Sequence, residues 1–372
     1  MQTDHSRMPL IGTLKAISCL LIASHHLTLY GPMPDFAYPL IPDLIDWLRE
    51  NGQIAVQVFF IIAGFLSARK LAPYGIPLVT DPMHVIKQRY IRLVIPYLAA
   101  LTLAIGCAAL ARAWMTHDFI PNTPNFFQLL AHIFLLHDLL NQEALSAGVW
   151  FVAIDFQLFV LVVTALWLSS QIEYRFPRLK LIHLILIASL TVVSLFVFNR
   201  NSYWDETAFY FFGSYGLGIL VYWASHKQYH LFWFTLLGIL VIAALLVDFR
   251  SRIAVAGVVM LILGLAKQYE FLESRIMPNF LTYLGRASYS IFLIHFPLCL
   301  IINAVFFRFL PSQPTIHLFG LTLALGISIM GGILFFRWFE NQPITDKMRL
   351  WLPIGFLASG TLVILANNAK SI

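Results

Sequence analysis

Long apolar segments recur along nearly the whole chain of 372 residues, and they constrain its fold more than any other feature. A helix that crosses a bilayer needs about 20 mostly apolar residues. Segments that approach or reach this length lie at 10–30, 52–68, 93–111, 148–169, 181–198, 207–224, 231–247, 253–267, 280–307, 316–336 and 351–366. The sequence therefore predicts an all-α, polytopic bundle of transmembrane helices.

Composition leaves no room for a sizeable soluble domain. Charged residues make up 11% of the chain, whereas soluble domains carry about 25%. The net charge of +6 is small, and the sequence has no nucleic-acid-binding signature. The first apolar run is longer than the core of a signal peptide, which predicts a retained helix. The three cysteines of the chain lack paired spacing, and we therefore expect neither a disulfide framework nor a metal site.

One segment, 126–140, is ambiguous, because it is short and carries His132, His137 and Asp138. We expect it to be interfacial or re-entrant. With the N-terminus in the cytoplasm, most Lys and Arg residues then fall on the cytoplasmic side, as the positive-inside rule requires. If 126–140 crossed the membrane, the basic cluster Arg175–Lys180 would lie outside, which disfavours that topology.

The first span contains titratable side chains that are costly in lipid. Lys15 lies near its cytoplasmic end, and His25 and His26 lie further along. At about 100° per residue, Lys15 and His26 share one helical face and are roughly 16 Å apart along the axis. This face offers a cation at one end and a proton acceptor at the other. The alternative is that Lys15 reaches lipid phosphates and the histidines bond to carbonyls.

Three further groups of polar residues lie in or beside later spans. Arg89 and Arg92 are neighbours on one helical face and suit a phosphate-bearing ligand, although ordinary membrane anchoring explains such pairs equally. Asp155 lies inside a span beside Gln157 and should face a histidine or arginine, either for function or as a structural ion pair.

The late span contains Ser288 and His295, two helical turns apart. A Ser–His nucleophilic pair is disfavoured, because about 10 Å separates the two along the axis. Hydrogen bonding between helices is the favoured interpretation.

Taken in order, these segments resemble the acyltransferase-3 family of integral membrane acyltransferases. The family's first helix carries an arginine and a histidine with ten residues between them. Lys15 and His26 match these two positions, with lysine replacing arginine. Gly52–Phe65 resembles the second-helix motif, with Ala63 in place of serine.

The later motifs match as well. Arg89 and Arg92 correspond to the basic motif before the third helix, and Trp150–Phe159 resembles the tryptophan-to-glutamate motif, with Asp155 in place of glutamate. The closing motifs match at Gly285, Ser288, Tyr289, Ser290, His295 and Phe339–Pro343.

The resemblance implies an activity. Members move acyl groups, commonly acetyl, from a cytoplasmic acyl-CoA to acceptors at the outer side, usually cell-envelope sugars. It therefore implies an O-acetyltransferase of the bacterial inner membrane, with acetyl-CoA as donor, a polysaccharide or lipopolysaccharide sugar as acceptor, and no metal. The ten-helix family core would occupy 8–345, and 346–372 would form an appended span and tail.

The resemblance and the chemistry together suggest roles for the site residues. His26 is the expected general base, with His25 second. Lys15, Arg89 and Arg92 would hold the phosphates of coenzyme A. Asp155 or Glu340 would orient the histidine ring or stabilise its protonated form. Supporting or oxyanion-stabilising roles fall to Gln157, Ser288, Tyr289, His295 and Glu340.

Other functions fit parts of the pattern. A proton-coupled transporter or flippase of an envelope precursor would also place ionisable residues in the membrane, although it should show repeated halves with interrupted helices, which the sequence lacks. An acyltransferase with a lipid, peptide or small-molecule acceptor and a structural or sensory membrane protein are further alternatives. Direct transfer and a covalent acyl-enzyme both stay open, as do the acyl chain and the oligomeric state.

Overall fold

The computed structural model describes residues 8–226, 228, 230–273 and 277–370, and the regular secondary structure of these residues is helical throughout. The last two residues of the predicted tail, 371 and 372, lie outside this range. The helices are α1 Pro9–Leu29, α2 Met33–Ala37, α3 Pro42–Asn51, α4 Val56–Leu71, α5 Pro82–Trp114, α6 Phe126–Ile133, α7 Val149–Arg175, α8 Ile182–Phe196, α9 Ala208–Ala224, α10 His230–Val247, α11 Ser251–Gln268, α12 Asn279–Phe309, α13 Pro314–Phe335 and α14 Asp346–Lys370.

The predicted all-α membrane bundle is confirmed. Among the described residues, 10 helical segments are long and apolar enough to cross a membrane, and α9 is a shorter apolar helix. Together they coincide with the predicted spans. By contrast, α6 has 8 residues and is therefore only about 12 Å long, far short of a hydrocarbon core of about 30 Å. The segment is thus too short to cross the membrane as one helix, and its interfacial or re-entrant location stays a prediction.

The chain divides into two compact units. Unit 1 comprises Met1–Ser18, Ile54–Arg89 and Ile154–Gly285, and unit 2 comprises Cys19–Gln53, Tyr90–Ala153 and Arg286–Ile372. Four of the boundaries between the units fall inside helices, so α1, α5, α7 and α12 each contribute residues to both units.

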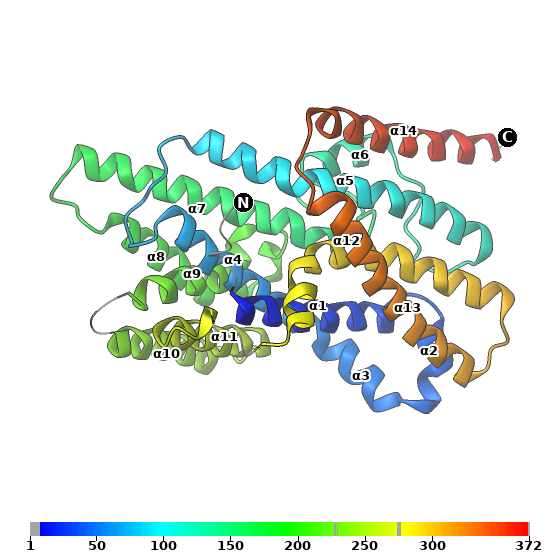
Figure 1. The fold of residues 1–372 in the computed structure, drawn as a ribbon, viewed down its shortest axis with the longest axis horizontal. Helices are drawn as coiled ribbons and strands as arrows, with labels where there is room; N and C mark the ends of the chain where they lie inside the picture. The colour runs from blue at the N-terminus through cyan, green and yellow to red at the C-terminus, as the bar shows by residue number, and fades with distance from the viewer. Residues whose placement is uncertain (1–7, 227, 229, 274–276, 371–372) are drawn as a thin grey trace. The chain divides into compact units, whose positions relative to one another are not determined.

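Unit 1 is built around α9, whose residues are buried except for Phe209. Helices α4, α8, α10 and α11 all contact it, and Figure 1 shows α10 and α11 side by side. Glycines allow α4 and α9 to approach closely. A Cβ atom on Gly64 would lie 1.9 Å from the carbonyl oxygen of Tyr215, and one on Gly218 would lie 2.1 Å from that of Ile61. Such close backbone contact through small residues is a common way to pack helices in lipid.

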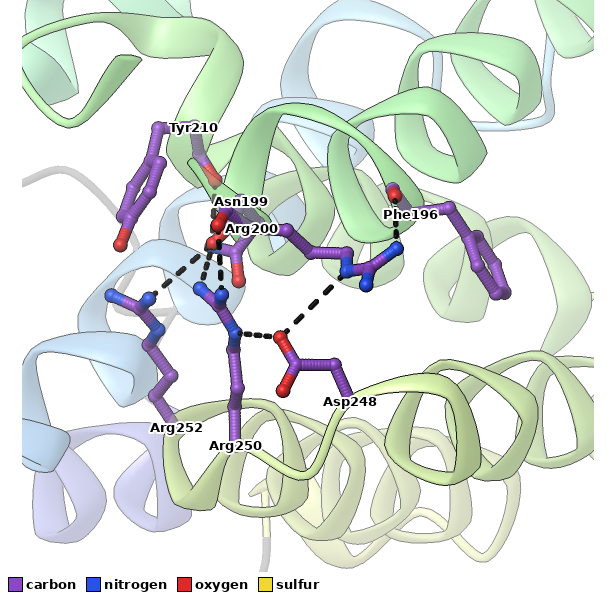
Figure 2. A network of polar contacts seen from close by, with 7 residues as sticks. All are labelled: Phe196, Asn199, Arg200, Tyr210, Asp248, Arg250 and Arg252. Atoms are coloured by element: carbon purple, nitrogen blue, oxygen red, sulfur yellow. Dashed lines mark hydrogen bonds and ion pairs between the residues drawn. The ribbon is translucent and has the colours of Figure 1, made fainter. Parts of the chain in front are cut away.

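An arginine-rich network ties the turn between α10 and α11 to the end of α8 (Figure 2). Arg250 Nε donates to Asp248 Oδ2 at 2.8 Å, and its guanidinium also donates to the carbonyls of Asn199 and Arg200. Arg200 Nε lies 3.7 Å from the same carboxylate. The hydrogen bond from Arg250 and the charges of both arginines hold the pKa of Asp248 below its usual range. These side-chain bonds thus hold the turn against the segment that follows α8.

In unit 2, an asparagine on α12 helps to fix the C-terminal end of α1. Asn303 on α12 accepts from the backbone N–H of Met33 at 3.2 Å and donates to the carbonyl of Tyr30 at 3.3 Å. Between them, Gly31 adopts φ +103°, and a Cβ atom there would lie 2.3 Å from the Asn303 side chain. Helix α2 then packs against α13, and α14 lies beside α6 (Figure 1). The end of α1 that carries His25 and His26 is therefore held in a defined place.

Candidate active site

Two histidines from different helices meet in unit 2. His26 Nδ1 on α1 lies 2.7 Å from His295 Nε2 on α12, and the two rings are nearly coplanar, with an angle of 16° between their planes and centroids 4.9 Å apart. His295 is buried, and its Nδ1 lies 2.7 Å from the carbonyl oxygen of Phe292. A carbonyl oxygen only accepts, so His295 Nδ1 carries a hydrogen. In the neutral ring, His295 Nε2 is then the acceptor, and His26 Nδ1 is its donor.

This order of hydrogen bonds assigns the tautomer of His26. Because its Nδ1 donates to His295, its Nε2 carries the lone pair. A neutral imidazole with an available lone pair is the form that a general base requires. When His26 accepts a proton at Nε2, it still donates from Nδ1 to His295. The bond between the two histidines therefore persists in both protonation states.

His25 points to a different partner. Its Nδ1 donates to the carbonyl of Leu48 at 2.7 Å, and its side chain is buried. A Cβ atom on Gly52 would lie 2.5 Å from His25 Cβ, so only glycine fits this approach. His25 thus attaches α1 to the segment at the end of α3, and its contacts are those of a structural histidine.

The intramembrane carboxylate has an arginine partner within unit 1. Asp155 Oδ2 on α7 lies 2.5 Å from Arg89 Nη2 on α5, and the guanidinium lies 5.4 Å from the centroid of Phe159. The Asp155 side chain is 7% exposed. Of the other predicted donor-binding cations, Arg92 is exposed and Lys15 is half-buried. Arg89 and Arg92 therefore differ in environment, although they are three residues apart.

The late serine-tyrosine-serine motif makes helix-to-helix contacts in unit 2. Tyr289 donates from its hydroxyl to the carbonyl of Leu93 at 2.9 Å. Ser290 donates to Glu340 Oε2 from its backbone N–H at 3.2 Å and from its hydroxyl at 2.6 Å. The carbonyl of Ser288 accepts from the thiol of Cys19 at 3.3 Å. This motif fastens α12 to α1, to α5 and to the π-helical segment Phe336–Glu340 that follows α13.

Gln157 has one satisfied and one unsatisfied end. Its Oε1 accepts from the backbone N–H of Ala208 at 3.0 Å, which caps the start of α9. Its Nε2 is buried, and among the described residues it has no hydrogen-bond acceptor. Buried polar atoms of this kind are rare and call for an explanation. Within the same described ranges, no group of three or more His, Cys, Asp or Glu side chains could hold a metal ion.

An aromatic row leads from His26 to the surface of unit 2, and sequence reasoning missed it. The ring of Tyr30 meets those of His26 and Phe119 edge-on, with centroids 5.4 Å and 5.5 Å away. The ring of Phe119 stacks on that of His117 at 5.1 Å, and Phe119 is 45% exposed. His117 and Phe119 lie in the loop between α5 and α6, where no periodic pattern marks them.

A second histidine pair is fully buried beside α6. His132 donates from Nδ1 to the carbonyl of Gln128 at 2.9 Å and accepts at Nε2 from the backbone N–H of Leu145 at 3.2 Å. The ring of His137 stacks on it with centroids 4.2 Å apart. Burial lowers the pKa of His132 to about 4 and, together with the neighbouring His132, that of His137 to about 3. Both rings are therefore neutral at physiological pH.

This pair should make the folded protein sensitive to mild acid. Because the folded-state pKa values lie below the usual 6.5, the unfolded chain binds more protons between about pH 4 and 6.5. The free energy of unfolding is thus largest above pH 6.5 and falls as the pH drops through this window. At pH 5 we expect a loss of about 2 kcal/mol per histidine. Melting temperatures of the detergent-solubilised protein between pH 7.5 and 4.5 measure this loss.

Two variants test whether the buried histidine pair causes the change of melting temperature with pH. His137→Phe keeps a stacked ring without a titrating group, so its melting temperature should vary less with pH than that of the wild type. His84→Ala removes an exposed histidine and should leave the profile unchanged. An unaltered profile for His137→Phe would contradict the assignment.

The chain was compared with family models, curated proteins and solved structures. Residues 11–366 match the model of the acyltransferase-3 family, which is described as an acyltransferase domain. Comparisons with curated proteins and with solved structures find no match. The matched range includes most of α14, and the domain boundary at residue 345 stays a prediction.

Proposed function

The chain belongs to the acyltransferase-3 family, and from this premise we propose that it is a membrane O-acyltransferase. It transfers an acyl group, expected to be acetyl, from a cytoplasmic acyl-CoA to a hydroxyl of a cell-envelope polysaccharide or lipopolysaccharide sugar. The observation that carries the proposal is the His26–His295 pair. Its hydrogen bonds leave a basic nitrogen on a histidine that the family motif also selects.

The proposed reaction uses this nitrogen twice. As the acceptor hydroxyl attacks the thioester carbonyl, His26 Nε2 takes its proton and a C–O bond forms. The C–S bond then breaks, and the protonated His26 returns the proton to the sulfur, which leaves as the thiol of coenzyme A. His295 accepts a hydrogen bond from His26 throughout, so it positions the ring and stabilises its charged form. The developing oxyanion needs donors, and Gln157, Ser288 and Tyr289 stay the proposed ones. Tyr289 would first have to release the carbonyl of Leu93, to which its only hydroxyl hydrogen is donated.

The donor is proposed to bind through cations at the cytoplasmic side. Lys15, Arg89 and Arg92 are the candidates, on the orientation that the positive-inside rule favours. Arg92 is exposed, which suits a phosphate contact, whereas Arg89 is already paired with Asp155. We propose the bacterial inner membrane as the location, with the N-terminus in the cytoplasm.

A host that expresses the protein provides the test. Its envelope polysaccharide is analysed by NMR before and after mild base, beside that of a host with an empty vector. We expect base-labile acyl esters only with the protein, and measurable binding of acetyl-CoA to the purified protein. Absence of both results would exclude acyl transfer from acetyl-CoA.

A transporter or flippase is the alternative that a specific observation supports. The Arg89–Asp155 pair lies within apolar helices, and such intramembrane pairs also occur in proton relays. A transporter would move an envelope precursor across proteoliposome membranes without forming an ester, and it would have no reason to bind acetyl-CoA. The same two measurements therefore separate the two functions.

A further inference from the structure

We propose that Tyr30, Phe119 and His117 form a platform that binds a sugar ring of the acceptor beside His26. The inference rests on the proposed acyl transfer and assigns acceptor-binding residues for it. It concerns residues that belong to none of the family-like motifs and that lie in a loop and at a helix end.

The platform is continuous with the proposed base. The ring of Tyr30 contacts that of His26 on one side and that of Phe119 on the other, and Phe119 stacks on His117. All four residues belong to unit 2. The inner end of the row is thus the ring that would take the proton, and the outer end, Phe119, is accessible.

The platform is also held rigidly. The carbonyl of Tyr30 accepts from Asn303, and its ring packs edge-on against Phe296 with centroids 5.1 Å apart. Phe296 and the neighbouring Ile120 belong to one buried apolar cluster. A rigid aromatic surface binds a ligand with little loss of conformational entropy. The row therefore behaves as a preformed wall rather than a mobile flap.

The chemistry of the row fits a pyranose. One face of such a ring presents C–H groups, which pack on the electron-rich face of an aromatic ring, while its edge presents hydroxyls. Binding sites combine an apolar wall with a few polar groups that fix orientation. His117 Nδ1 is buried, and among the described residues it has no hydrogen-bond partner. A rotation of the His117 ring about its Cβ–Cγ bond would bring this atom to the surface, where a sugar hydroxyl can bond to it while the sugar ring stacks on Phe119.

Exposed aromatic residues also anchor proteins at the membrane surface. That role requires no contact between the aromatic row and His26, and it leaves the unpartnered His117 nitrogen unexplained. An acceptor platform accounts for both observations. The two roles differ in what a truncation changes, because an acceptor platform affects only the step that involves the acceptor.

The test compares two phenylalanines. Purified protein in nanodiscs receives radiolabelled acetyl-CoA and, as acceptor, oligosaccharides released from the host's envelope polysaccharide and de-esterified with mild base. Phe119→Ala should raise the KM for the oligosaccharide about tenfold, and leave unchanged both the KM for acetyl-CoA and its slow hydrolysis without acceptor. Phe126→Ala, which truncates a ring that is 57% exposed on α6 outside the row, should match the wild type. His117→Ala should change the same acceptor KM in the same direction.

The outcomes separate the platform from the proposed function. If the wild type transfers acyl groups and Phe119→Ala does so with the same acceptor KM, the platform is refuted and the acyl transfer stands. If Phe119→Ala changes both KM values and the melting temperature, its role is structural and the platform is again refuted. If the wild type transfers nothing to these oligosaccharides, the saccharide acceptor and the platform fall together.

Discussion

Replacement of His26 by alanine should abolish acyl transfer in a protein that still reaches the membrane. Loss of a general base typically lowers a rate by 10²–10⁴-fold, roughly enough to remove ester signals from an NMR spectrum of the polysaccharide. The alanine variant also leaves the buried Nε2 of His295 without its donor. An unpaired buried acceptor costs about 1–3 kcal/mol, so the melting temperature should fall as well.

A second substitution separates chemistry from stability. His26→Asn places an amide nitrogen near the position of Nδ1 and can still donate to His295, but it has no basic nitrogen. We therefore expect His26→Asn to be more stable than His26→Ala and equally inactive. Ester content by NMR, protein level by blot and melting temperature after purification measure the three quantities.

His25→Ala is the matched control. It removes the adjacent histidine, whose Nδ1 bonds to the carbonyl of Leu48, and should lower stability while retaining transfer. Full activity in His26→Asn together with loss of activity in a stable His25→Ala protein would assign the base to His25 instead.

The spans could be predicted from the sequence because lipid imposes both length and apolarity on a helix. The same constraint made His26 conspicuous, since a titratable side chain in an apolar run is costly. Its partner could not be predicted, because His295 lies 269 residues away and helical periodicity says nothing about which helices are neighbours. The sequence suggested only that His295 bonds to some other helix.

Spacing along the sequence also failed to predict the partner of Arg89. Its three-residue separation from Arg92 correctly puts both on neighbouring positions of α5, which suggested one shared ligand. The structure instead pairs Arg89 with Asp155, 66 residues away, and leaves Arg92 exposed. The expectation that Asp155 needs an arginine or histidine was correct, but electrostatics alone could not select which one. Phe119 and His117 were missed because an irregular loop has no periodicity to interpret.

Removing one charge of the Arg89–Asp155 pair should destabilise the protein more than removing both. Breaking a buried ion pair typically costs about 3–5 kcal/mol, because the remaining charge stays in a poorly solvated place. We expect the lower part of this range, since Arg89 is 33% exposed. Arg89→Gln and Asp155→Asn should each lower the melting temperature, and the double variant should recover most of the loss, because two amides can bond to each other. Additive losses in the double variant would contradict a direct pair.

The same variants decide whether Arg89 also binds the donor. If Arg89 serves only Asp155, the double variant regains both stability and the wild-type KM for acetyl-CoA. If Arg89 also contacts a donor phosphate, the double variant is stable but keeps a raised KM, because the lost cation is not replaced. Arg92→Gln provides the comparison, since it removes an exposed charge and should raise this KM without changing the melting temperature. A donor KM that responds to neither arginine would move the phosphate site away from α5 and leave Lys15 as the candidate to test.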